Sequence, residues 1–155
     1  MSLWLVLLAL LVSGSTARLP WNGDYIDWVE WGNAIKIAEK EKKPIFMLIH
    51  KTWCAACKAL EESFQRSAEI EVIGSHFVMA NVEDEDEPTD KQYQAQGSYS
   101  PRILFLDSQG VVSSIVNELQ PNAMYVHNYF ETEAIVDSML RALTLLSHLK
   151  NDDEL

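Results

Sequence analysis

Apolar positions follow helical and strand periods in alternating segments of the chain. Four apolar residues at the spacing of one helix face begin at Trp31, and Pro44 ends the charged stretch that follows them. Residues 45–49 are an unbroken apolar run, as in a strand that is buried on both faces of a sheet. The pattern predicts a helix before Pro44 and a buried strand directly after it.

The same alternation continues along the rest of the chain. A helix is predicted from about Cys54, and a further helical turn ends at Gly74. The later elements are a strand at 77–82, a hairpin of strands 103–107 and 111–116, and a last helix capped by Thr132. This order contains one β-α-β crossover, so it predicts an α/β domain with a mixed sheet.

Composition and charge exclude several classes of protein. Hydrophobic residues make up 48% of the 155 residues, enough for the core of one domain. The formal net charge is −11, and six of the acidic residues lie between Glu83 and Asp90. The sequence has no basic cluster to gather phosphates, so nucleic acid is not expected as a partner.

The acidic run does not fit a calcium-binding EF-hand. Counted from Asp84, Thr89 and Ala95 stand where that loop needs glycine and glutamate. The run from Glu83 to Glu87 is therefore predicted to be a solvated loop, with weak calcium or partner binding as the alternative.

Both ends of the chain resemble targeting signals. The apolar run from Leu3 to Val12 is followed by small residues spaced as at a signal-peptidase site, which predicts a signal peptide over residues 1–17. The run is too short to cross a bilayer, so no stable membrane anchor is expected. A single domain over 18–151 would then precede an ending that resembles the K-D-E-L retrieval signal. These features predict the lumen of the endoplasmic reticulum and a retrieval receptor that binds Asp152, Asp153, Glu154 and Leu155.

The candidate chemistry lies at the two cysteines, Cys54 and Cys57. A C-x-x-C pair where a buried strand gives way to a helix places the first sulfur at the helix N-terminus, where unpaired N–H groups favour a thiolate. Lys51 and Lys58 add positive charge nearby. We predict that Cys54 is an exposed nucleophile with a lowered pKa, and that Cys57 is the shielded thiol that resolves the mixed disulfide.

Three other interpretations of the pair compete. A structural disulfide across four residues would stabilise the fold by only about 2 kcal/mol in the chain-entropy model. A metal site with His50 and His76 can be drawn, but the spacing matches no zinc pattern. Two inert buried thiols are the third alternative, and the position at a helix start argues against them. No metal is expected.

Two motifs resemble a known family. The W-C-x-x-C motif that begins at Trp53, and Ser100-Pro101 ahead of a strand, are similar to those of the thioredoxin fold. The stretch from Trp28 to Phe130, the acidic run and the D-E-L ending resemble small endoplasmic-reticulum oxidoreductases related to the anterior gradient proteins. The resemblance implies a thiol–disulfide oxidoreductase that acts on client proteins, with glutathione as redox partner and no bound cofactor. The alternative is a non-catalytic client-binding or adaptor protein on the same fold.

The resemblance also implies roles for single residues. A cis Ser100-Pro101 bond would lie against the cysteines and, with Trp53, would contact substrate. Leu48 stands where thioredoxins carry a buried acid that helps proton transfer to the second cysteine, so water or another side chain would have to serve here. The inner pair Ala55-Ala56 lacks the histidine of the isomerases, so a very strong oxidant is not expected.

Three further features have two interpretations each. His50, at a strand end, either tunes Cys54 or is a structural histidine. Arg102 either contacts a substrate or pairs with a surface acid, and the second role is the commoner one. The aromatic residues near the expected mature start either form a peptide-binding patch or pack the first helix into the core; they are Trp21, Tyr25, Trp28 and Trp31.

Overall fold

The computed structural model describes residues 19–94, 97–120 and 124–152. The predicted signal peptide lies outside the described residues, as do the last three residues of the predicted retrieval signal. In the described part of the chain, no helix is long and apolar enough to cross a membrane.

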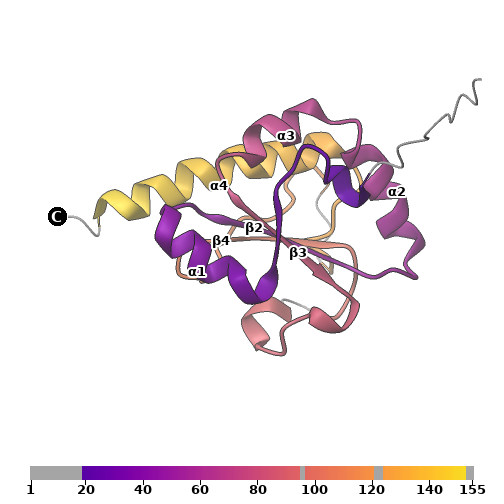
Figure 1. Ribbon diagram of the computed structural model, residues 1–155, viewed down its shortest axis with the longest axis horizontal. Coiled ribbons are helices and arrows are strands. Elements are labelled where there is room, and N and C mark those ends of the chain that lie inside the picture. Colours follow the sequence, from indigo (N-terminus) through magenta and orange to yellow (C-terminus); the bar gives the residue numbers. More distant parts are fainter. Residues whose placement is uncertain (1–18, 95–96, 121–123, 153–155) are drawn as a thin grey trace, which may run out of the picture.

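A four-stranded mixed sheet forms the centre of the fold, as the alternating pattern predicted (Figure 1). The strand order is β1-β3-β2-β4; β3 runs parallel to β1 and β2, and β4 runs antiparallel to β2. The strands are β1 (Trp28–Glu30), β2 (Ile45–His50), β3 (Val78–Glu83) and β4 (Arg102–Leu106). The sequence analysis did not predict β1, because three residues are too few to show a period.

Helices cover both faces of the sheet, and this explains the unbroken apolar run of β2. Phe46 and Leu48 face one core with α2, α3 and α4, whereas Ile45 and Met47 face a second core with α1. Every residue of β2 is buried. Figure 1 shows α3 and α4 side by side. The helices are α1 (Trp31–Glu41), α2 (Ala55–Phe64), α3 (Ala68–Gly74) and α4 (Thr132–Asp152).

The predicted hairpin after β4 forms only in part. Its turn is present: Gly110 has a φ of +84°, and its backbone N–H donates to the carbonyl of Asp107 over 3.1 Å. The returning chain then makes a single bridge, between Leu106 and Val112. The predicted strand at 111–116 is therefore wrong, because the chain leaves β4 and pairs next with the segment near residue 126.

Candidate active site

Cys54 is the N-cap of α2 and follows the short turn after β2. Its backbone is extended, with φ −87° and ψ 114°, and its N–H donates to the carbonyl of Lys51 over 3.2 Å. The N–H of Cys57 donates to the Cys54 Sγ over 3.2 Å. A donor of the first helical turn thus points at the sulfur, where it stabilises a negative charge. The predicted position at a helix start is confirmed.

The two thiols have pKa values that move in opposite directions. Burial alone would raise the pKa of Cys54, but hydrogen bonds from Cys57, Ser100 and the Ala56 backbone outweigh it and lower this pKa below its usual value. Burial raises the pKa of Cys57 to about 11, and the hydrogen bond to the Cys54 side chain adds to the rise. Cys54 is therefore the thiol that ionises first, in the order predicted.

Ser100 and Pro101 lie directly against Cys54. Their peptide bond is cis, as the family resemblance implied, and the Ser100 carbonyl oxygen is 3.6 Å from the Cys54 Sγ. Cys54 is 9% exposed and Cys57 only 2%, so the expected difference in access holds, but the prediction of an exposed sulfur is wrong. The Ser100 backbone is therefore in contact with the sulfur that is predicted to react.

Trp53 stands out from the loop before Cys54 with 77% of its surface exposed. Next to Ser100, the ring of Tyr99 meets that of Tyr125 edge to face, with 4.8 Å between the ring centroids. Tyr125 is itself 41% exposed, and the sequence analysis did not single it out. Contact of Trp53, Ser100 and Pro101 with substrate stays a prediction.

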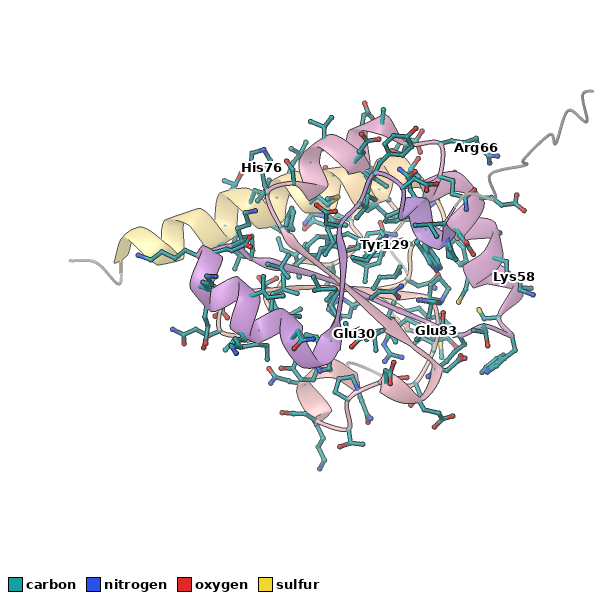
Figure 2. The ribbon with its side chains drawn as sticks, in the orientation of Figure 1. Glu30, Lys58, Arg66, His76, Glu83 and Tyr129 are labelled. Carbon is teal, nitrogen blue, oxygen red and sulfur yellow. The ribbon has the colours of Figure 1, made fainter. Side chains whose placement is uncertain are left out.

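The two lysines near the cysteines have different surroundings. The Lys51 ammonium is 2.6 Å from the carbonyl oxygen of Asp84 and 2.9 Å from Oε2 of Glu87. Lys58 is exposed and points outward from α2 (Figure 2). Tuning of Cys54 by Lys51 and Lys58 stays a prediction.

His50 is buried at the end of β2. Its Nε2 is 2.6 Å from Oδ1 of Asn81, and its ring centroid is 4.9 Å from that of Trp21. These contacts fit the structural interpretation, and tuning of Cys54 by His50 stays a prediction. His76 precedes β3 at the opposite end of the sheet from His50 (Figure 2), so these histidines do not gather with the cysteines. Within the described ranges, no group of three or more His, Cys, Asp or Glu is placed to hold a metal ion.

Asp84, a member of the acidic run, is hydrogen-bonded to the loop that leads to Cys54. Its carboxylate accepts hydrogen bonds from the backbone N–H and the hydroxyl of Thr52, each over 2.8 Å. These bonds lower the pKa of Asp84. Glu83, Glu85 and Asp86 are exposed, so the prediction of a solvated loop is correct for them, but it is wrong for Glu87, whose side chain is only 13% exposed.

Arg102 is 1% exposed, so of its two interpretations the structure supports pairing with an acid and not contact with a substrate. Its guanidinium forms an ion pair with Glu87 and donates to the carbonyl of Tyr99 over 2.5 Å. The partner is thus a half-buried member of the acidic run. Strand register could have signalled this neighbourhood, because His50 pairs with Glu83 in parallel strands and the segments that follow must lie side by side.

Residues 27–108, more than half of the chain, match the family model described as Thioredoxin-like. The chain belongs to the thioredoxin-like family. It is 32% identical to anterior gradient protein 3 of Mus musculus over 126 residues, and this aligned region covers 80% of this chain and 75% of that protein. It is 30% identical to the anterior gradient protein 2 homolog of Homo sapiens, over 80% of this chain and 70% of that protein. A solved structure described as DsbH Oxidoreductase shares the fold, with a TM-score of 0.53 and 19% identity over 77% of this chain and 85% of that chain.

The cysteines of this thioredoxin-like chain belong to an apolar core cluster. Leu48 is fully buried in the same core cluster as Cys57 and Phe64. The position that the family resemblance matched to a buried acid therefore holds a packed leucine, as the sequence analysis stated. Proton transfer to Cys57 has no carboxylate at this position.

The aromatic residues before α1 and at its first position mostly fill the core of the thioredoxin-like domain. Trp21 is 2% exposed and packs edge to face on Phe64, with 5.6 Å between ring centroids. Trp28 packs against the same cluster, and Trp31 meets Tyr93 on the other face of the sheet. Core packing is therefore confirmed for the three tryptophans, although they fill both cores rather than the surroundings of α1 alone.

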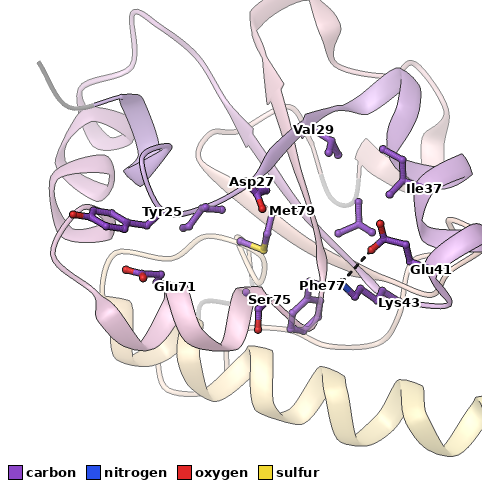
Figure 3. Close-up of a pocket in the computed structure, with 13 residues that line it drawn as sticks. Tyr25, Asp27, Val29, Ile37, Glu41, Lys43, Glu71, Ser75, Phe77 and Met79 are labelled. Carbon is purple, nitrogen blue, oxygen red and sulfur yellow. Dashed lines mark ion pairs between the residues drawn. The ribbon is translucent and has the colours of Figure 1, made fainter. Parts of the chain in front are cut away.

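Tyr25, the fourth of these aromatic residues, is 61% exposed and lines a pocket beside β1 (Figure 3). The pocket has a volume of about 360 Å³ and also contains Asp27 and Glu71. An ion pair of Lys43 and Glu41, 3.1 Å apart, stands at its other side. The pocket lies by the start of β3, at the opposite end of that strand from the cysteine site.

Proposed function

We propose that the protein is a thiol–disulfide oxidoreductase that acts on client proteins through Cys54 and Cys57. The observation that carries the proposal is the division between the two sulfurs at the start of α2. One has a lowered pKa and accepts an N–H hydrogen bond, and the other is buried with a raised pKa. Membership of the thioredoxin-like family supports the same chemistry.

The first step is attack of the Cys54 thiolate on one sulfur of a client disulfide. A new S–S bond joins Cys54 to the client as the client's own S–S bond breaks. The second client sulfur leaves as a thiolate and takes a proton from water. The N–H of Cys57 has stabilised the attacking thiolate until this point, because it donates to the Cys54 Sγ.

The second step is attack of Cys57 on the Cys54 sulfur of the mixed disulfide. Cys57 must first lose its proton, and because burial raises its pKa, this is the step that needs a base. With Leu48 at the position of the buried acid, water or another side chain accepts that proton. The reduced client leaves, and the protein carries a Cys54–Cys57 disulfide.

Glutathione closes the cycle in this proposal. Two molecules of reduced glutathione convert the Cys54–Cys57 disulfide back to two thiols and form one molecule of glutathione disulfide. The same steps in reverse would oxidise a client. No bound cofactor or metal takes part in the exchange.

We further propose that the protein works in the lumen of the endoplasmic reticulum. The apolar run from Leu3 to Val12 and the Asp152–Leu155 ending support a signal peptide and a receptor-read retrieval signal. Within the family, the stretch from Trp28 to Phe130 resembles thioredoxin domain-containing protein 12, a small oxidoreductase of that compartment. This resemblance is also the support for glutathione as the redox partner.

Glutathione-dependent reduction of insulin disulfides tests the proposal. The purified protein should accelerate the reaction, and Cys54→Ala should abolish the acceleration because it removes the attacking sulfur. If the wild-type protein binds unfolded clients but does not accelerate reduction, the adaptor alternative replaces the enzyme.

A further inference from the structure

Glu87 connects the two loops that form the cysteine site. Its Oε2 lies 2.9 Å from the Lys51 ammonium, and its Oε1 pairs with the guanidinium of Arg102. Lys51 opens the loop that leads to Cys54, and Arg102 directly follows the cis Ser100-Pro101 segment. One carboxylate therefore holds the loop of the reactive sulfur to the segment that covers it.

We call the contacts of Glu87 with Lys51 and Arg102 the Glu87 bridge. Both ends of this bridge are hydrogen-bonded to backbone close to the Cys54 sulfur. The carbonyl of Lys51 accepts the N–H of Cys54 over 3.2 Å. On the other side, Arg102 donates to the carbonyl of Tyr99 over 2.5 Å. Tyr99 precedes Ser100, whose carbonyl oxygen is 3.6 Å from the Cys54 Sγ. A change at Glu87 is thus expected to alter how Ser100 and Cys54 face each other.

Burial makes the bridge hard to replace by water. The side chains of Arg102, Glu87 and Lys51 are 1%, 13% and 18% exposed. Burial by itself raises the pKa of Glu87, but its hydrogen bonds to Lys51 and Arg102 outweigh this and lower the pKa, so the carboxylate is ionised at neutral pH. A buried cation that loses such a partner is left with an uncompensated charge.

We propose that Glu87 is a positioning residue that sets the approach between the Cys54 sulfur and the Ser100 backbone, and thereby the rate of exchange with peptide disulfides. This inference rests on the proposed function. A peptide disulfide has to lie beside Ser100 to meet the sulfur, because Ser100 is in contact with it. A small alkylating reagent needs only the thiolate. Misplacement therefore slows exchange much more than alkylation.

The test compares two reactions of the full chain carrying Cys57→Ala, in which Cys54 is the remaining thiol. One is formation of a mixed disulfide with a disulfide-bonded model peptide, and the other is alkylation by iodoacetamide. Glu87→Gln should slow the exchange about tenfold and change the alkylation rate less than about threefold. The matched control is Glu85→Gln, an exposed acid of the same run, which should change neither rate.

Each result decides between distinct explanations. Equal losses in both reactions would mean that Glu87 acts on the thiolate itself or on folding, and would overturn the positioning role. Unchanged rates would overturn it as well. A parent protein that does not exchange with the peptide at all would instead contradict the proposed function, and the inference with it.

A second variant keeps the test decisive if Glu87→Gln does not fold. Lys51→Met removes one half of the bridge and leaves the buried pair of Glu87 and Arg102 intact. It should slow the exchange about fivefold more than it slows alkylation, because the alkylation rate also reports any effect of the lost Lys51 charge on the Cys54 thiolate. Wild-type rates in both reactions for Lys51→Met would overturn the proposal.

Discussion

The backbone N–H of Cys57 donates to the Sγ of Cys54 across 3.2 Å. This hydrogen bond distinguishes the two sulfurs, because only the Cys54 sulfur accepts it. It places a donor on the first sulfur, where a thiolate is stabilised, while the side chain of Cys57 is buried one turn inside α2. The order of events in the proposed exchange follows from this asymmetry.

Alkylation of the reduced protein should modify Cys54 first. Its pKa is lowered and it is the more exposed of the two, whereas Cys57, with a pKa of about 11, carries little thiolate at neutral pH. With less than one equivalent of iodoacetamide, peptide mass spectrometry should find the label on Cys54, at a rate that rises with pH up to its pKa. Label on Cys57 at pH 7 would reverse the assignment of roles.

Folding stability should fall as the pH is lowered from about 6.5 to 4. Burial, and then the nearby charge of Arg102, lower the pKa of His127 to about 4, while an unfolded histidine titrates near 6.5. Between these values the unfolded chain binds a proton that the folded chain does not. The free energy of unfolding should therefore decrease by up to about 3 kcal/mol across this window.

Urea unfolding at several pH values measures this dependence. His127→Leu should flatten it, because the titrating group is gone and its Nδ1 has no hydrogen-bond partner among the described residues to lose. The matched control is His76→Leu, at an exposed histidine, which should keep the wild-type dependence. A wild-type slope in His127→Leu would show that another group is responsible.

The parts of the fold that the sequence predicted are those with strong local signals. The apolar run at 45–49 was predicted to be a fully buried strand, and it is β2, one of the two central strands of the sheet. The cysteines could be placed at a helix start because a strand pattern ends just before them. The strand predicted at 111–116 was wrong because the segment makes a single bridge to β4, and Ile115 is buried without a strand ladder.

The site residues that were missed depend on tertiary neighbours. A run such as Glu83 to Glu87 is solvated unless buried cations face it, and the cations here come from two separate loops. Arg102 is a charged residue that directly follows Pro101, and such a residue is usually exposed. Its side chain is nevertheless almost fully buried. The pairing of β2 with β3 on one side and with β4 on the other brings these charges together.

Removal of Asp152 to Leu155 should send the protein into the medium of cells that express it. The reason is loss of the proposed retrieval signal, which is read by a receptor. Asp152→Lys, which creates the full K-D-E-L ending, should remain inside the cell and serves as the control. Equal secretion of the intact and shortened chains, measured by immunoblot, would contradict retention by this signal.

Trapping of mixed disulfides tests the central claim, that Cys54 attacks and Cys57 resolves. Cells that express Cys57→Ala should accumulate covalent adducts with clients on non-reducing gels, because the resolving thiol is absent. Cys54→Ala should give none, because Cys57 is buried and burial raises its pKa, so the remaining thiol is shielded and largely protonated. Adducts that form equally with both variants, or only with Cys54→Ala, would contradict the account.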